Sequence, residues 1–310
     1  MDLIFCGTPA FAVPTLERLV ASGFDVKLVV TQPDRPSGRG MAVAASPVKQ
    51  AALRQGLAVT QPERIKINAE FRALLESLRP AAIVVVGYGR IIPAWMLELP
   101  PHGNINLHAS LLPRYRGAAP VQWAIANGES ITGVSTMLID AGLDTGPVLR
   151  QQPAPIHEDD TSLTLWPRLA ELGAGLMVET LHGLPAGLVT GMPQDPAMAT
   201  HAPILKKEDG RIDFSRTANE ICNRLRGFQP WPGAYTTFRG NHLAWTQAQP
   251  AEIASAAAPG EILLQGGLLL VGCGGGSAVA VGELHPAGKR RMTAAGFISG
   301  YHPRNGEAFG

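Results

Sequence analysis

Apolar positions along the first 182 residues alternate between short continuous runs and longer segments with helical spacing. Ala82–Val86 is an almost entirely β-branched run, as expected of a buried parallel strand. Asn68 precedes a segment whose apolar residues recur every three or four positions, which predicts a capped helix. This alternation of strands and helices predicts a doubly wound α/β domain. Further strands are predicted at Leu3–Cys6, Val26–Thr31, Leu57–Thr60, Asn104–His108, Gly133–Ile139 and Val148–Gln151, and further helices before Gly23, after Ser46, at Pro93–Leu97, from Pro120 and at Ser162–Leu181.

The pattern changes beyond this region. Residues 183–205 are rich in Gly, Pro and Thr and are predicted to be a linker. From residue 206 to 310, Thr217 and Glu220 form a capping-box signature before one helix, and several short β-like runs with Gly-rich turns follow. The pattern predicts a second, small β domain, either a barrel or a sandwich, with a frayed tail after Tyr301.

Composition and charge narrow the class of protein. The chain has 310 residues, 45% of them hydrophobic, and a net charge of +1, which describes an ordinary globular protein. Residues 1–204 hold 15 Lys and Arg against 17 Asp and Glu, whereas residues 205–310 hold 11 against 8. The mild basic excess of the C-terminal part fits a weak polyanion contact or chance.

The three cysteines are scattered and lack Cys-x-x-Cys spacing, which argues against disulfides and against zinc. The chain shows neither a signal-peptide pattern nor an apolar stretch long enough to span a bilayer. We expect a cytoplasmic monomer without metal.

Asn106 and His108 provide the most specific chemistry. They lie two residues apart in a predicted strand, so both side chains leave the same face. The strand ends at Ser110-Leu111-Leu112-Pro113, and open α/β sheets bind ligands at the carboxyl ends of their strands. An amide beside an imidazole can polarise a carbonyl and move a proton. Taken alone, Asn-x-His is more often a hydrogen-bonded pair in a half-buried strand.

The N-terminal strand runs into Gly7-Thr8-Pro9 and then a helix, as in dinucleotide-binding proteins. The second and third glycines of Gly-x-Gly-x-x-Gly are absent, as is an acidic residue at the end of the next strand. A tight turn that leads into a helix explains Gly7 without a ligand.

Several long motifs resemble those of the folate-dependent formyltransferases. They are Asn106–Pro120, with the sequence NLHASLLPRYRGAAP, and Asp140–Gly146, with the sequence DAGLDTG. The start FCGTPAFAVPTLERL, the segments TQPDRPSGRG and SPVK, and the C-terminal KKEDGRIDFS, FQPWPGAY and LHPAGKRRM are similar to the methionyl-tRNA formyltransferase family in particular. The resemblance covers nearly the whole chain.

The resemblance implies a Rossmann-like catalytic domain over residues 1–182, a linker over 183–205 and an OB-like, tRNA-binding β-barrel over 206–310. It implies transfer of a formyl group from 10-formyltetrahydrofolate to the α-amino group of methionyl initiator tRNA. The implied catalytic residues are Asn106, His108 and Asp144. The implied folate site consists of Ser110, Leu111, Leu112 and Pro113, the backbone of Gly87, Tyr88 and Gly89, and the loop that begins at Asp140.

The implied tRNA contacts start with Arg39, in the turn Gly38-Arg39-Gly40. Met41–Ala45 follow where the family often has lysines, a departure that removes cationic contacts from this loop. Other candidate tRNA contacts are Lys206, Lys207, Lys289, Arg290 and Arg291.

Other residues near these motifs admit two interpretations each. Arg114 and Arg116 are expected either on a solvated loop or against the tRNA backbone or folate tail. Trp231, between two prolines, is expected to anchor the packing of the small domain rather than to stack on a base.

The chemistry of formyl transfer fits these residues. Attack of an amine on a formyl carbon creates an oxyanion, and each well-placed donor to that oxygen lowers the barrier by about 3–4 kcal/mol. An α-amino group has a pKa of about 7.7–8.0, so much of it must lose a proton. We hypothesise that Asn106 and His108 stabilise the oxyanion, that His108 protonates the leaving N10, and that Asp144 accepts the amine proton. The alternative makes His108 the base.

Three other functions compete with this one. The acceptor could be a purine-precursor ribotide or a sugar nucleotide, although the C-terminal Lys-Arg-Arg run and Trp-Pro motif favour tRNA. Water could be the nucleophile, as in a formyltetrahydrofolate hydrolase, which would release formate without an amine. A non-catalytic tRNA-binding module is the third alternative, and the intact Asn106, His108 and Asp144 argue against it.

Overall fold

A computed structural model describes residues 1–37, 42–253 and 257–310 of the chain. These residues form two compact units. The first comprises residues 1–117, 131–155 and 166–202, and the second comprises residues 118–130, 156–165 and 203–310.

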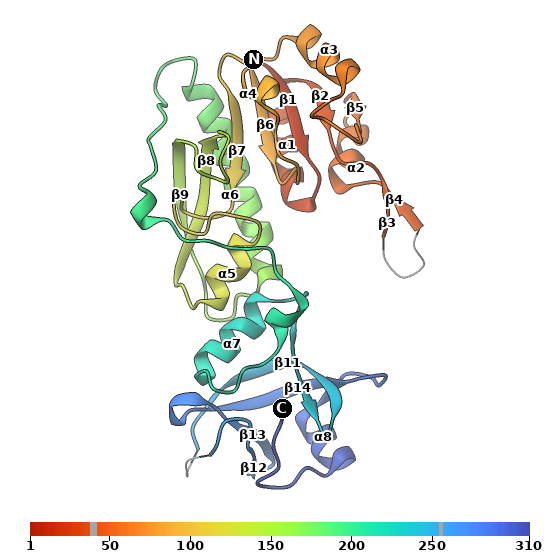
Figure 1. Ribbon diagram of the computed structural model, residues 1–310, viewed down its shortest axis with the longest axis vertical. Helices are drawn as coiled ribbons and strands as arrows, with labels where there is room; N and C mark the ends of the chain where they lie inside the picture. The colour runs from red at the N-terminus through yellow and green to blue at the C-terminus, as the bar shows by residue number, and fades with distance from the viewer. Residues whose placement is uncertain (38–41, 254–256) are drawn as a thin grey trace. The chain divides into compact units, whose positions relative to one another are not determined.

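The first unit is built on a seven-stranded sheet with the order β5-β2-β1-β6-β7-β8-β9 (Figure 1). The first five of these strands are parallel, while β8 and β9 pair antiparallel at one edge. The chain passes from β1 to β2 and β5 on one side of β1 and then to β6 and β7 on the other. The strands β1 and β6 therefore flank the topological switch point, where the strand order reverses. The doubly wound prediction is confirmed. The strands are β1 (Asp2–Gly7), β2 (Asp25–Val30), β5 (Val59–Thr60), β6 (Ala82–Val86), β7 (Asn104–His108), β8 (Ile131–Leu138) and β9 (Val148–Pro155).

Helices lie over both faces of this sheet. Apolar residues of α3 and α4, among them Phe71, Leu75 and Met96, pack in one cluster with Ile4 and Val85 of the sheet. On the other face, Leu107 of β7 lies against Gly173 of α6, where an added Cβ would meet the leucine at 2.6 Å. The helices that belong wholly or partly to this unit are α1 (Val13–Ala21), α2 (Pro47–Arg54), α3 (Ala69–Leu78), α4 (Ala94–Leu97) and α6 (Ser162–Gly183), with short 3₁₀ turns at Ala10–Ala12 and Pro196–Met198.

Local signals account for most of these boundaries. Ser46 caps α2 by accepting a hydrogen bond from the Lys49 amide, and Asn68 caps α3 by accepting one from Phe71. The small hairpin of β3 (Arg35–Ser37) and β4 (Ala42–Ala44) was not predicted, because its strands are short and rich in Pro, Ser and Ala.

The second unit contains a six-stranded antiparallel sheet with the order β10-β11-β14-β13-β12, to which β15 adds beside β14. Helix α7 packs against β11 and β14 of this sheet and against α5. The capping box of Thr217 and Glu220 is present at the start of α7, as predicted. The elements are α5 (Pro120–Ala126), a 3₁₀ turn at Lys207–Gly210, α7 (Ala218–Gly227), β10 (Ala234–Phe238), β11 (Asn241–Ala251), β12 (Ile262–Gln265), β13 (Leu268–Gly272), a 3₁₀ turn at Gly274–Gly276, β14 (Ala278–Pro286), β15 (Met292–Thr293) and α8 (Ala294–Tyr301).

The C-terminal tail corrects one expectation. Phe309 is buried in the aromatic core of the second unit, and its amide donates to the carbonyl of Gly260. The amide of Gly310 donates to the carbonyl of Thr237. The prediction of a frayed tail was wrong. Phe309 packs on residues that are distant in sequence, and a single aromatic residue gives no periodic pattern that would indicate this packing.

Candidate active site at the carboxyl end of β7

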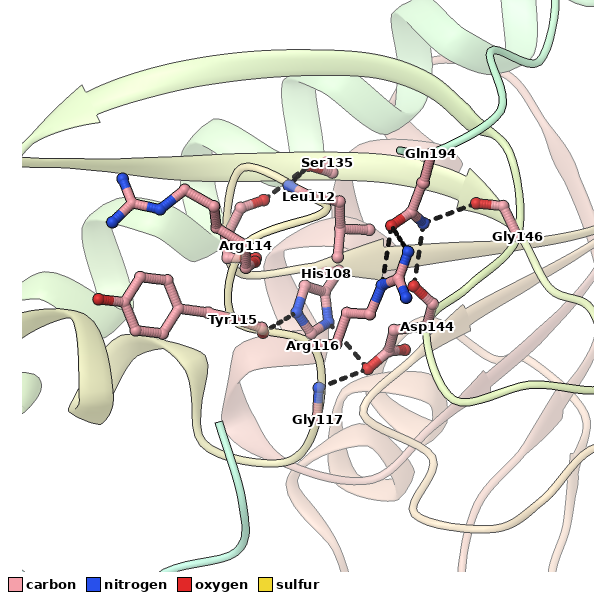
Figure 2. Close-up of polar contacts among 11 residues, drawn as sticks. His108, Leu112, Arg114, Tyr115, Arg116, Gly117, Ser135, Asp144, Gly146 and Gln194 are labelled. Carbon is pink, nitrogen blue, oxygen red and sulfur yellow. Dashed lines mark hydrogen bonds and ion pairs between the residues drawn. The ribbon is translucent and has the colours of Figure 1, made fainter. Parts of the chain in front are cut away.

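The imidazole of His108 lies at the end of β7, with a defined partner for one ring nitrogen. Its Nε2 is 2.8 Å from the carbonyl oxygen of Tyr115, and its Nδ1 is 3.7 Å from Oδ2 of Asp144 (Figure 2). The side chain is 7% exposed, and that of Asp144 is 17% exposed. Because a carbonyl only accepts hydrogen bonds, the Tyr115 contact places a proton on Nε2 and leaves Nδ1 directed toward the carboxylate.

Asn106 shares a face of β7 with His108, as the period of two predicts. On the same face, Asn104 is buried beneath α4 and donates from Nδ2 to the carbonyl of Met96. The side chain of Asn106, one period nearer the carboxyl end, is only half-buried. This face of β7 therefore passes from the interior beneath α4 to the half-buried Asn106 and then to the buried His108 at the carboxyl end of the strand.

Asp144 is fixed by its backbone as well as by its carboxylate. Its Oδ2 accepts a hydrogen bond of 2.8 Å from the amide of Gly117. Its φ of 53° falls in the left-handed region, as does the φ of 59° at Tyr115, and such non-glycine residues cluster at functional sites. Gly146 ends the loop, and a Cβ there would lie 1.8 Å from the carbonyl oxygen of Leu138. The loop can take this path only with glycine at position 146.

A buried serine holds the turn that follows β7. The Oγ of Ser135, on β8, donates to the carbonyl of Ser110 at 2.6 Å and accepts from the amide of Leu112 at 3.1 Å. Gln151 donates to the same Oγ and to the carbonyl of Leu112. Ser110 is itself fully buried, and its hydroxyl donates to the carbonyl of Arg114. The polar groups of Ser110 and Leu112 thus maintain the turn, while Leu111 and Pro113 are half-exposed.

The loop after β6 lies at the switch point and exposes backbone there. Gly87 and Gly89 are exposed and have φ of 55° and 75°, whereas Tyr88 between them is buried. Burial raises the pKa of the Tyr88 hydroxyl. The carbonyl of Tyr88 accepts hydrogen bonds from Thr8 and Gln32. Between residues 87 and 89, the exposed atoms therefore belong to the two glycines, which offer main-chain atoms to a ligand.

Gln194 is a site residue that the sequence did not indicate. Its Oε1 accepts hydrogen bonds from Nε and Nη2 of Arg116 at 3.0 and 2.7 Å. Its Nε2 donates to the carbonyls of Asp144 and Gly146 at 2.9 and 2.7 Å (Figure 2). Gln194 lies in the segment expected to be a linker, and these partners are far from it in sequence, so no local pattern points to it.

The segment from Gln194 to Ala202 also holds the loop that carries Tyr115. The amide of Tyr115 donates to Oγ1 of Thr200, the amide of Arg116 donates to the carbonyl of Thr200, and the amide of Ala202 donates to the carbonyl of Arg116. These contacts join the second half of the 183–205 segment to the first compact unit.

Two arginines that follow the turn have different environments. Arg116 is 8% exposed and bound to Gln194, so the expectation of a solvated loop was wrong for this residue. Arg114 is exposed and its guanidinium lies 5.5 Å from the centre of the Tyr115 ring. The prediction that Trp231 anchors the packing of the small domain was also wrong, because its side chain is 55% exposed.

The remaining predicted residues fall into three groups. Asp140 is exposed, and its Oδ1 accepts from the amide of Gly142 and the hydroxyl of Thr145, which braces the Asp144 loop. Arg39 lies outside the described residues. The other candidate cations are all exposed and belong to the second unit: Lys206, Lys207, Lys289, Arg290 and Arg291. The guanidinium of Arg291 lies 3.6 Å from the carboxylate of Glu283.

Within residues 1–37, 42–253 and 257–310, no group of three or more His, Cys, Asp or Glu side chains is placed to hold a metal ion. None of the described helices is long and apolar enough to cross a membrane.

The family model described as formyl transferase matches residues 1–181, and the model of the formyl transferase C-terminal domain matches residues 204–302. The chain is 61% identical to the methionyl-tRNA formyltransferase of Koribacter versatilis, over 100% of this chain and 99% of the relative. It is 59% identical to that of Acidobacterium capsulatum, over 97% and 96% of the two chains.

Solved structures with the same fold are more distant in sequence. An N-formyltransferase from Helicobacter canadensis, in complex with folinic acid and dTDP-3-aminofucose, superposes with a TM-score of 0.67 at 19% identity. The match covers 90% of this chain and 98% of that one. A protein bound to an amino sugar nucleotide therefore shares most of this fold, and the fold by itself does not distinguish tRNA from a sugar nucleotide.

Proposed function

The chain belongs to the methionyl-tRNA formyltransferase family, and on that premise we propose that it transfers a formyl group from 10-formyltetrahydrofolate to the free α-amino group of methionyl initiator tRNA. One observation carries the assignment of the catalytic residues. Nδ1 of His108 and Oδ2 of Asp144 lie 3.7 Å apart at the carboxyl end of β7, on the strand face that also carries Asn106.

His108 moves the proton in this proposal. Its Nε2 is held by Tyr115, so only Nδ1 is available to the reactants. Neutral Nδ1 accepts the proton that the attacking amine loses and then donates it to N10 of the departing tetrahydrofolate, so no net proton is gained or lost. While the ring is protonated, the carboxylate of Asp144 faces its positive charge.

Asn106 stabilises the charge that develops on the formyl oxygen. Its neutral amide projects from the same face of β7 as His108 and remains half-exposed, so an Nδ2–H can point at that oxygen. A fixed donor of this kind contributes about 3–4 kcal/mol to lowering the barrier in acyl transfer.

We propose that the folate lies against the exposed backbone of Gly87 and Gly89 and the loop at Asp140, with Leu111 and Pro113 beside it. The buried position of Tyr88 supports a role for its main chain alone. Here the one-carbon unit comes with the cosubstrate, and the protein supplies orientation and electrostatics.

The tRNA is proposed to contact Arg39 and the cations of the second unit. Lys206, Lys207, Lys289 and Arg290 are exposed, as phosphate contacts require. The exposed ring of Trp231 is available to the same partner. In this proposal, residues 1–182 catalyse, residues 183–205 connect, and residues 206–310 bind tRNA.

We also propose that the protein works as a cytoplasmic monomer. Charged initiator tRNA is a cytoplasmic substrate, and the three cysteines are free and buried. Light scattering at assay concentration tests the monomer, which a dimer mass would overturn.

The function is tested by incubating the protein with 10-formyltetrahydrofolate and charged initiator tRNA, with charged elongator tRNA as the control. We expect the mass of one formyl group to appear on the methionine of the initiator tRNA. Formate release without any amine acceptor would identify a hydrolase instead, and formylation of an amino sugar nucleotide in place of the tRNA would identify the other acceptor class.

A further inference from the structure

We propose that Gln194 is a positioning residue for the formyl transfer, because its carboxamide holds the two loops that present His108 and Asp144. The inference rests on the proposed function and extends it to a residue in the second half of the 183–205 segment, which belongs to the first compact unit. Four hydrogen bonds of the Gln194 side chain support it, and the chemistry of each partner determines which atom donates.

The orientation of the Gln194 amide has one solution. The guanidinium of Arg116 only donates, so the oxygen of Gln194 must face it. The carbonyls of Asp144 and Gly146 only accept, so the amide nitrogen must face them. Both lone pairs of the oxygen and both hydrogens of the nitrogen are used. A glutamate would keep the Arg116 contact but turn an oxygen toward two carbonyl oxygens.

The Asp144 side of this arrangement determines where the carboxylate lies. Gln194 binds the carbonyls at positions 144 and 146, and Asp140 braces the loop through Gly142 and Thr145. A φ of 53° at Asp144 is one that a non-glycine residue seldom adopts without such support.

The Arg116 side of this arrangement determines where the imidazole of His108 lies. Three consecutive residues each contact one member of the site: Tyr115 accepts from His108, Arg116 binds Gln194, and Gly117 donates to Asp144. Gln194 thus joins this tripeptide to the Asp144 loop, beside the hydrogen bond that Gly117 donates to Asp144. Loss of its nitrogen donor would remove the support at the carbonyls of Asp144 and Gly146, while loss of the whole amide would also remove the contact with Arg116.

Gln194→Glu and Gln194→Met test the proposal in the full-length protein. Glutamate removes only the donor half, and methionine removes both halves without adding charge. Gln265→Glu is the matched control, because Gln265 is exposed at the end of β12 in the second unit. Each variant is measured for kcat and KM toward charged initiator tRNA, for thermal unfolding, and for hydrogen exchange at the Gly117 amide.

We expect kcat to fall about tenfold or more in both Gln194 variants, since small misplacement of reacting groups is costly, while KM changes by less than about threefold. Protection of the Gly117 amide should fall by about tenfold or more, because its acceptor is Asp144. The control should match the wild type. A Gln194→Glu protein with the control's kcat, or with unchanged Gly117 exchange, overturns the proposal, and so does unfolding of both variants at the assay temperature.

The exchange measurement separates this inference from the proposed function. Wild-type protein that formylates no tRNA would overturn the function, yet the Gly117 amide would still report whether Gln194 positions Asp144. Active wild-type protein with a fully active Gln194→Met variant would overturn the positioning role alone.

Discussion

The carbonyl oxygen of Tyr115 lies 2.8 Å from Nε2 of His108 and thereby selects which ring nitrogen is free to react. The contact depends on a tyrosine backbone in the left-handed region, with φ of 59°. The other nitrogen faces Asp144, which is itself held in that region. Two sparsely populated backbone conformations therefore orient the imidazole and the carboxylate toward each other.

Replacing Asp144 with asparagine should lower kcat by about 10²-fold or more, in the range typical of general acid–base catalysis. The amide keeps the shape of the side chain and can still accept from Gly117, but it places no charge opposite Nδ1 of His108. The shape of kcat/KM against pH should change as well, which steady-state assays across the neutral range would measure. A pH profile identical to that of the wild type would show that Asp144 does not influence the proton transfer through His108.

Removing Lys289 and Arg290 together should weaken tRNA binding and reduce the slope of log Kd against log salt by about 1 for each phosphate that is no longer neutralised. Both side chains are exposed between β14 and β15. Arg291→Ala is the comparison, because its guanidinium lies 3.6 Å from Glu283 and we expect a smaller effect. Equal salt slopes for the double variant and the wild type would exclude this surface from the tRNA interface.

Truncating Phe309 to alanine should lower the free energy of unfolding of the second unit by about 3–5 kcal/mol. The ring is 4% exposed, and its centre lies 5.5 Å from Phe238 and 5.7 Å from Trp245. Urea unfolding followed by tryptophan fluorescence would measure the loss. Leu268→Ala, at a 55% exposed position of the same unit, should change stability by less than about 0.5 kcal/mol. Equal stability of the two variants would show that the tail does not complete the core.

Glu220 should make stability depend on pH through its capping box. Hydrogen bonds from the backbone amide and the hydroxyl of Thr217 hold the pKa of Glu220 below its ordinary value of 4.5. Because the folded-state pKa is lowered, the carboxylate stabilises the fold above about pH 4.5, and this contribution is lost as the pH falls through the lowered pKa.

The difference in stability between wild type and Glu220→Gln should therefore be present at neutral pH and shrink below about pH 4.5. Thermal unfolding of both proteins across that range is the measurement. Glu252→Gln, at an exposed position after β11, controls for the loss of one carboxylate. A stability difference that stays constant down to acid pH would contradict the capping role.

Elements with strong local signals were predictable. The run Ala82–Val86 and the segment Asn104–His108 are strands with the predicted limits, since periodicity and β-branching act over a few residues. The caps at Ser46, Asn68 and Thr217 are formed as expected, because a capping side chain binds an amide only three residues away.

Elements without such signals were missed. Helix α8, Ala294–Tyr301, contains Gly296 and Gly300, and its one fully buried aromatic residue, Phe297, packs on strands distant in sequence. Trp231 was expected to be an anchor from its flanking prolines, yet nothing local determines whether an aromatic ring in a turn meets a core or solvent.

The sequence by itself determined the alternation of elements, the caps, and the placing of Asn106 and His108 on one face, because each depends on neighbours along the chain. Tertiary structure alone decided which nitrogen of His108 is free, that Arg116 is buried, and that Gln194 joins the Tyr115 and Asp144 loops. The two loops are joined by hydrogen bonds between residues 50 and 78 positions apart, whose geometry exists only once the sheet has brought the loops together.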